Sequence, residues 1–261
     1  MPFINKDDEL YGKSKYFDLQ THFMFREFIV DLYMQWNTGY YISNPEKVYP
    51  FWNDNEEIMP QRGDMRTNII GLNIQYLFNS ERYSYKASFW QNEFQKRSAG
   101  SPMLGVEAYW TLGMTDSMMV ESAIPTTPFM GDQSFNQNDM LNAGINGGYA
   151  YTFVWNEKLS LSLCTLFGLS GCHNRVHYTQ DSYTLSKGIS VGITNTTRIS
   201  MGYDIAKYYF GLSYSRFSMT TKASGYNSWF SYDTGHIRIN FVKRFHLSRP
   251  IKILRPDLWI F

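Results

Sequence analysis

Apolar and polar residues alternate along most of this chain. Between Leu159 and Gly171 the odd positions are mainly leucine and phenylalanine, and the even positions are mainly serine, cysteine and glycine. A period of two is that of a β-strand with one apolar face. The alternating segments are long enough to cross a bilayer as tilted strands, and only helices and closed barrels can span a membrane. The pattern therefore predicts an all-β fold: an antiparallel, up-and-down transmembrane β-barrel.

Ten strands are predicted, joined by connections of two kinds. The strands are expected near residues 15–24, 27–37, 66–78, 82–94, 102–113, 140–155, 159–172, 189–203, 207–219 and 234–245. Short polar turns alternate with long loops near residues 38–65, 114–139, 173–188 and 220–233, as in bacterial barrels. The connection 114–139 falls on the short-turn side of this scheme. Either one predicted strand is not a strand, or the barrel has one long periplasmic loop.

The two faces of the strands indicate which side meets lipid. The polar side consists mostly of glycine, serine, threonine and asparagine with a few charges of both signs, which suits a crowded lumen. A soluble barrel turns its apolar side inward and needs charge on its outer surface. Aromatic residues gather at the short turns, where Tyr76 and Phe78 are expected to face Tyr83 and Tyr85 in an interfacial girdle.

Composition agrees with a membrane barrel and excludes some functions. The 261 residues carry a net charge of +1, which gives no argument for a nucleic-acid partner. Aromatic and charged residues each make up 18% of the chain, and no apolar run is long enough for a transmembrane helix. A soluble all-β protein remains the alternative.

We expect one barrel domain over residues 15–245, preceded by an N-terminal segment 1–14 and followed by a C-terminal tail 246–261. The first residues, from Met1 to Asp8, have neither a basic nor an apolar stretch and do not form a signal peptide. Because an outer-membrane protein must carry one, we expect this chain to be a trimmed form.

The candidate functional residues are charges that the alternation directs into the lumen. They are Asp18, Asp31, Lys86, Glu107, Arg198, Arg238 and Arg244. A lumen charge network can line a pore, as in a small porin-like channel. It can also form a salt-bridged plug that fills a narrow barrel, and this second interpretation is favoured.

Other chemistry is expected to be absent. Cys164 and Cys172 lie on one predicted strand about 26 Å apart, so both thiols are expected to be free. His173 and His177 do not converge on a strand, and no metal or cofactor is expected. His22 has no serine with a recognisable motif, so the protein is not expected to be an enzyme. The alternative, a barrel enzyme acting on lipid, would require a histidine and a serine to meet within about 3 Å.

Partners are expected at both ends of the barrel. The last predicted strand alternates cleanly and contains Phe241 and Phe245, which resemble the terminal signal that the bacterial barrel-assembly machinery recognises. The loop 38–65 carries several aromatic residues among polar ones and could bind an extracellular glycan or protein.

Several segments resemble an uncharacterised family of Bacteroidetes outer-membrane proteins, known as domain of unknown function 4421. They are Lys15–Leu19, Tyr76–Asn79, Arg82–Tyr85, Gln95–Ser101, Gly148–Phe153 and Asn240–Phe245. The most specific is the Gln-Lys-Arg-Ser-Ala-Gly-Ser run that begins at Gln95. Members normally carry a signal peptide and further strand-like sequence upstream, which implies that ten strands are visible here of twelve.

The resemblance implies an integral protein of the outer membrane, with lipid as its surroundings and no established activity. We expect a plugged structural barrel or a surface-binding protein. The alternatives are a small porin-like channel, a lipid-modifying enzyme and a soluble ligand-binding barrel.

Overall fold

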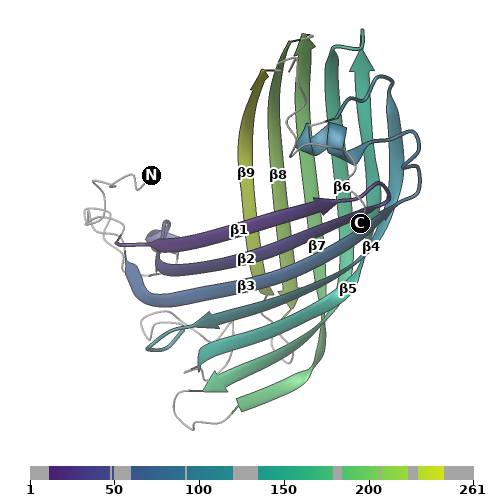
Figure 1. Ribbon diagram of the computed structural model, residues 1–261. Coiled ribbons are helices and arrows are strands. Elements are labelled where there is room, and N and C mark those ends of the chain that lie inside the picture. The colour runs from purple at the N-terminus through teal and green to yellow at the C-terminus, as the bar shows by residue number, and fades with distance from the viewer. Residues whose placement is uncertain are drawn as a thin grey trace, which may run out of the picture.

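The described chain forms one antiparallel sheet, seen in a computed structural model (Figure 1). The model describes residues 12–47, 49, 60–91, 93–119, 135–178, 184–205, 207–222 and 229–243. These residues contain nine strands: β1 (Lys15–Met24), β2 (Phe28–Tyr41), β3 (Gln61–Leu77), β4 (Ala99–Met114), β5 (Phe135–Trp155), β6 (Leu159–Tyr178), β7 (Thr184–Ile205), β8 (Tyr208–Lys222) and β9 (Trp229–Lys243). Two short helices, η1 (Pro45–Lys47) and η2 (Lys86–Trp90), lie in connections.

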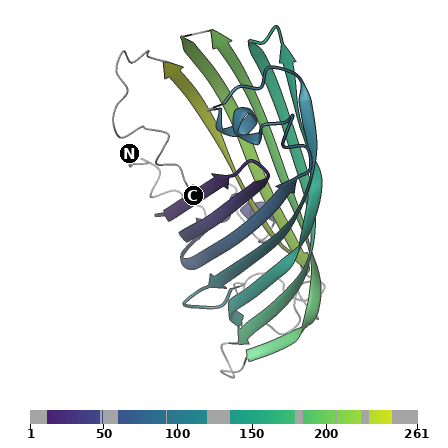
Figure 2. The ribbon, with the colours of Figure 1, turned by 45° about the vertical axis from the view of Figure 1, so that its right-hand side comes forward.

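Each strand pairs with its neighbour in sequence, so the topology is a simple up-and-down meander. The sheet curls into a half-barrel, so that β1 to β3 lie on the opposite side of the curl from β8 and β9 (Figures 1 and 2). The connections 25–27, 78–98, 156–158 and 206–207 lie at one end of the sheet, which we call the turn end. The opposite end of the sheet, where β2 ends and β3 begins, is called the loop end. The predicted antiparallel up-and-down fold is confirmed.

The predicted direction of the side chains is also confirmed. Outward positions such as Ile145, Leu163 and Val191 are exposed, whereas inward positions such as Asn142 and Ser162 are buried. Successive residues of a strand point to opposite faces, so one correct assignment places the whole strand. The outer face is therefore apolar and the interior largely polar.

The predicted strand 82–94 is wrong. Residues 78–82 form a turn, residues 83 and 84 have no regular secondary structure, and Lys86–Trp90 forms a short π-helix inside the curl of the sheet. Tyr83, Tyr85 and Phe89 alternate as on a strand, but they are buried because they pack into the lumen. With this segment removed, nine strands remain in the described residues, and β4 ends and β5 begins at the loop end. The irregularity in the predicted loop pattern thus came from one strand too many.

The two edge strands of the described sheet run in the same direction. Every neighbouring pair from β1 to β9 is antiparallel. An odd number of such strands leaves the first and the last parallel to each other, each with one edge unpaired within the described residues. Direct pairing of β1 with β9 would therefore be parallel, unlike every pair in the sheet.

Several sequence predictions fall outside the described residues. They are the tail 246–261, the residues Arg244 and Phe245, and most of the N-terminal segment 1–14. No helix in the described part of the chain is long and apolar enough to cross a membrane.

Candidate functional site in the lumen

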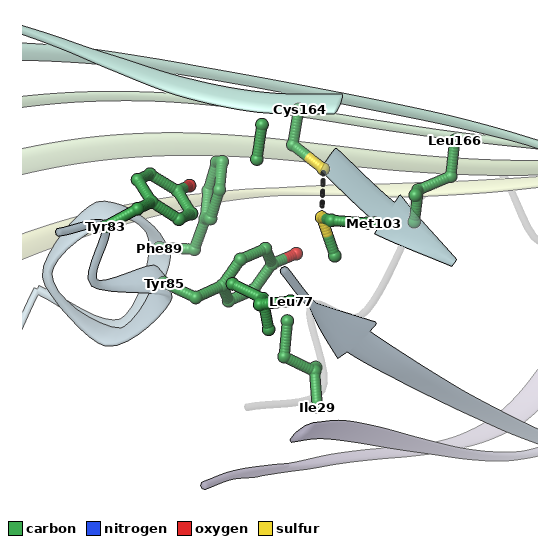
Figure 3. Close-up of a cluster of buried hydrophobic side chains, with 9 residues drawn as sticks. Ile29, Leu77, Tyr83, Tyr85, Phe89, Met103, Cys164 and Leu166 are labelled. Carbon is green, nitrogen blue, oxygen red and sulfur yellow. Dashed lines mark hydrogen bonds between the residues drawn. The ribbon is translucent and has the colours of Figure 1, made fainter. Parts of the chain in front are cut away.

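The turn end of the lumen is filled by the connection between β3 and β4. We call residues 78–91 and 93–98 the plug. Its aromatic residues Tyr83, Tyr85 and Phe89 lie against residues from five strands (Figure 3). These residues are Ile29, Leu77, Met103, Ala150, Cys164 and Leu166. All are buried, so the plug and the barrel wall share one apolar core.

Local hydrogen bonds explain why the plug turns inward instead of forming a strand. Ser84 Oγ accepts from the Ala87 backbone N–H at 3.1 Å, as at the start of a helix. Gln91 ends the turn in the left-handed region at φ 60°, and its N–H donates to Lys86 O at 2.7 Å. Burial raises the pKa of both Tyr83 and Tyr85, so both phenols are protonated at neutral pH.

The most specific family-like segment fastens the base of the plug. Gln95 Oε1 accepts from the Ser84 N–H at 2.9 Å, while its Nε2 donates to Arg82 O at 2.8 Å and Arg97 O at 2.9 Å. The Ser98 hydroxyl accepts from the Val154 N–H at 2.9 Å, which ties the plug to β5. Asn79 Nδ2 donates to Gly100 O at 2.7 Å. The family-like segments Tyr76–Asn79, Arg82–Tyr85 and Gln95–Ser101 therefore meet at the plug, whereas Lys15–Leu19 lies at the opposite end of the sheet.

One buried ion pair crosses the lumen above the plug. Arg198 Nη2 on β7 lies 2.7 Å from Asp31 Oδ2 on β2. His22 Nδ1 lies 2.6 Å from the other oxygen of Asp31, and the Arg198 guanidinium also donates to the Tyr85 hydroxyl. A buried carboxylate needs this kind of compensation, because desolvation of an unpaired charge is costly. The pair joins the plug to opposite walls of the lumen.

Glu107 occupies a separate polar layer. It accepts from Thr194 Oγ1 at 2.6 Å and from Asn146 Nδ2 at 2.8 Å. No cation contacts it within the described residues. A Cβ at Gly168 would lie 2.3 Å from Glu107 Oε1, so the glycine makes room for the carboxylate. The lumen is closely filled at this level.

The remaining predicted lumen charges do not join this pair. Asp18 is exposed and accepts from Gln20 Nε2 at 3.1 Å. Lys86 lies 3.9 Å from Glu93 within the plug, because the segment that carries it is not a strand. Arg238 lines a small cavity beside His236, and Arg244 lies outside the described residues. Of the predicted network, only Asp31 and Arg198 form an ion pair with each other.

An aromatic layer that sequence reasoning missed closes the lumen toward the loop end. It consists of Tyr33, Tyr109, Phe217 and Tyr232. Phe217 lies 4.8 Å from the Tyr109 ring centre and 5.8 Å from that of Tyr33. Gly71 accommodates the Tyr109 ring, since a Cβ there would come within 2.5 Å of it. Tyr33 lies two residues after Asp31 on the same strand, so the alternation could have predicted that Tyr33 also points into the lumen.

The structure also locates the remaining candidate residues. Cys164 and Cys172 are free and buried, as predicted. His22 is held by Asp31, and no serine hydroxyl contacts its ring within the described residues. No group of three or more potential metal ligands occurs in that same part of the chain. Phe241 is exposed on the outer face of β9, whereas Phe245 lies outside the described residues.

A meander that curls around a polar, filled interior and exposes an apolar outer face defines a β-barrel-like protein. The chain belongs to the family described as domain of unknown function (DUF4421), which matches residues 1–245. No curated protein matches the sequence.

Proposed function

We propose that this chain is an integral outer-membrane β-barrel protein whose lumen is closed, with a structural or surface-binding role. The observation that carries the proposal is the inverted burial of the two faces. Ile145, Phe167 and Val191 are 62%, 63% and 55% exposed, whereas Asp31 and Asn142 are fully buried. Soluble proteins rarely expose such continuous apolar surface, while a bilayer requires it.

We expect the refolded protein to be heat-modifiable. Unboiled protein in detergent should migrate differently from boiled protein on a gel and show a β-type circular dichroism spectrum. A membrane sheet whose strands are held by continuous inter-strand hydrogen bonds resists detergent until it is heated. Recovery of a folded monomer without detergent or lipid would contradict the proposal and return the soluble alternative.

The closed lumen is supported by three successive obstructions. The plug fills the turn end, the Arg198–Asp31 pair crosses the middle, and the aromatic layer lies toward the loop end. Barrels of this size have interiors that side chains can fill. A porin-like channel is the second candidate, favoured only by the charged groups in the lumen.

The purified protein is expected to show no steady conductance in planar bilayers. An open porin, reconstituted under the same conditions, is the positive control. Protease protection of the inserted protein verifies that it entered the bilayer. Stable openings of inserted wild-type protein would refute the closed lumen and favour the channel.

The proposed role includes no catalytic step. Contact with the barrel-assembly machinery remains part of the proposal, supported by the clean alternation of β9 and the outward position of Phe241.

A further inference from the structure

A small cavity of about 30 Å³ lies in the lumen against β8 and β9, beside the Arg198–Asp31 pair. We call it the β9 cavity. Residues of β1 and of the plug also line it. Its polar wall is formed by His22, Arg198, Ser213, Ser215, His236 and Arg238. A space of this size holds one small ion or about two water molecules.

The strand register explains why these polar side chains meet. Ser213 of β8 pairs with Arg238 of β9, and Ser215 pairs with His236. On the other side of β8, Ser215 pairs with Arg198 of β7. Residues that pair directly across a sheet share one face, and Arg198 is buried in the lumen, so all five side chains lie on the lumen face. Three neighbouring strands therefore place two cations and two hydroxyls in one patch of the lumen wall.

One positive charge in the wall of the β9 cavity has no counter-charge in contact with it. Arg198 is neutralised by Asp31 at 2.7 Å. Arg238 is half-buried and forms no ion pair with any described residue, and none of the described lining residues is acidic. Charged side chains within a membrane-spanning interior are normally paired, because desolvation of a lone charge is costly. The wall of the cavity therefore favours an anion.

The Ser213 hydroxyl is an independent indication of a ligand. Ser213 is only 9% exposed and lines the cavity, yet its hydroxyl forms no hydrogen bond with any described residue. This hydroxyl is not among the fully enclosed atoms, so the cavity is accessible to it. A hydroxyl donates one hydrogen bond, and the His236 ring donates another, since a neutral imidazole carries one N–H. Both donors suit an anion held beside the Arg238 guanidinium.

We propose that the β9 cavity binds a small monovalent anion of about the size of chloride. Arg238 supplies the charge, and Ser213 and His236 supply hydrogen-bond donors. The volume of about 30 Å³ leaves no room for a phosphate ester or a sugar acid. This inference goes beyond the proposed closed barrel and does not depend on whether the lumen conducts.

Chloride is the probe, and its binding is measured from the line width of the chlorine NMR signal. The full chain is refolded in lauryldimethylamine oxide and titrated with sodium chloride. Sodium gluconate keeps the ionic strength constant, because gluconate is too large for the cavity. We expect the protein to cause an excess line width that saturates as chloride increases and that sodium bromide removes by competition.

The decisive variant is Ser213→Ala, which removes a hydroxyl that has no partner in the described protein and should therefore leave folding intact. It should weaken chloride binding about tenfold, the effect of losing one hydrogen bond to a charged group. Arg238→Met should abolish measurable binding, because the charge is lost. Two matched controls should bind chloride as the wild type does: Ser170→Ala, since Ser170 Oγ is buried and unpartnered, and Arg175→Met, since Arg175 is exposed. Neither control residue lines the cavity.

Three results would overturn the proposal. One is a wild-type line width that shows no saturable excess, which would mean that the cavity holds only water. Another is chloride binding that Ser213→Ala leaves unchanged. The third is equal weakening by either control variant, since the ion would then lie elsewhere. The mobility of unboiled protein on a gel verifies that each variant is folded, and Ser213→Ala decides alone if Arg238→Met does not fold.

Discussion

Replacing Arg198 by methionine is expected to destabilise the folded protein by about 3–5 kcal/mol, because the Asp31 carboxylate is left buried without its cation. Both side chains of this pair are nearly inaccessible, and their charged atoms are 2.7 Å apart. The free energy of unfolding can be measured by urea titration of protein folded into lipid vesicles. Replacing Asp31 by leucine in the same molecule should recover part of the loss, since no unpaired carboxylate remains.

The chain contains a matched control for this experiment. Arg66 and Asp116 form another arginine–aspartate pair, 3.9 Å apart, with side chains 51% and 76% exposed. Asp116 lies beyond the end of β4, where water can solvate it when its partner is removed, so Arg66→Met should change stability far less than Arg198→Met. Equal losses in the two variants would mean that the Arg198–Asp31 pair is also solvated, and the closed lumen would be refuted.

Arginine at Ile237 is expected to cost about 2–4 kcal/mol of folding free energy in a bilayer, whereas arginine at Thr234 should cost much less. The two positions lie on opposite faces of β9 and both carry β-branched residues, which removes strand propensity as an explanation. They are about 10 Å apart along the strand, so their depths in a bilayer are similar but not equal. Ile237 is 71% exposed on the apolar face, whereas Thr234 lines a cavity of about 620 Å³ at the loop end, where a long polar side chain has room. The comparison uses the same urea titration in vesicles.

The choice of position matters because most of the lumen has no space for a new side chain. Ser162, for example, is buried and its hydroxyl lies 2.8 Å from that of Thr152, which in turn contacts the plug at Ser88. Arginine there would be destabilising for steric reasons alone. Equal cost at Ile237 and Thr234 would show that the outer face does not meet lipid. Greater cost at Thr234 would point to a barrel with its apolar side inward.

Several of the family-like segments contribute residues to the plug. Asn79, Tyr85 and Gln95 perform one task, which is to turn the β3–β4 connection inward and keep it there. Gln95 binds main-chain groups of the same connection, and the Tyr85 hydroxyl binds Arg198 on the opposite wall. The segments around the plug therefore have a structural role, whereas the family-like segment Lys15–Leu19 lies at the other end of the lumen.

The sequence by itself determined which side of each strand faces outward. Alternation is a local property, since successive side chains on a strand must point to opposite faces. That is why Leu163 and Ser162 could be assigned without knowledge of any neighbouring strand, and why the polar interior and free cysteines were predicted correctly. The short turns at 25–27 and 156–158 could also be predicted from the sequence, because the residues that form a turn largely determine its conformation.

What lies inside the barrel could not be predicted from local sequence, because it depends on how distant strands pack together. Tyr83, Tyr85 and Phe89 alternate like strand residues, and nothing local distinguishes a ring that faces lipid from one that fills a lumen. The partners of Arg198 and Glu107 depended on the curl of the sheet, which brings Asp31 within reach across 167 residues of sequence.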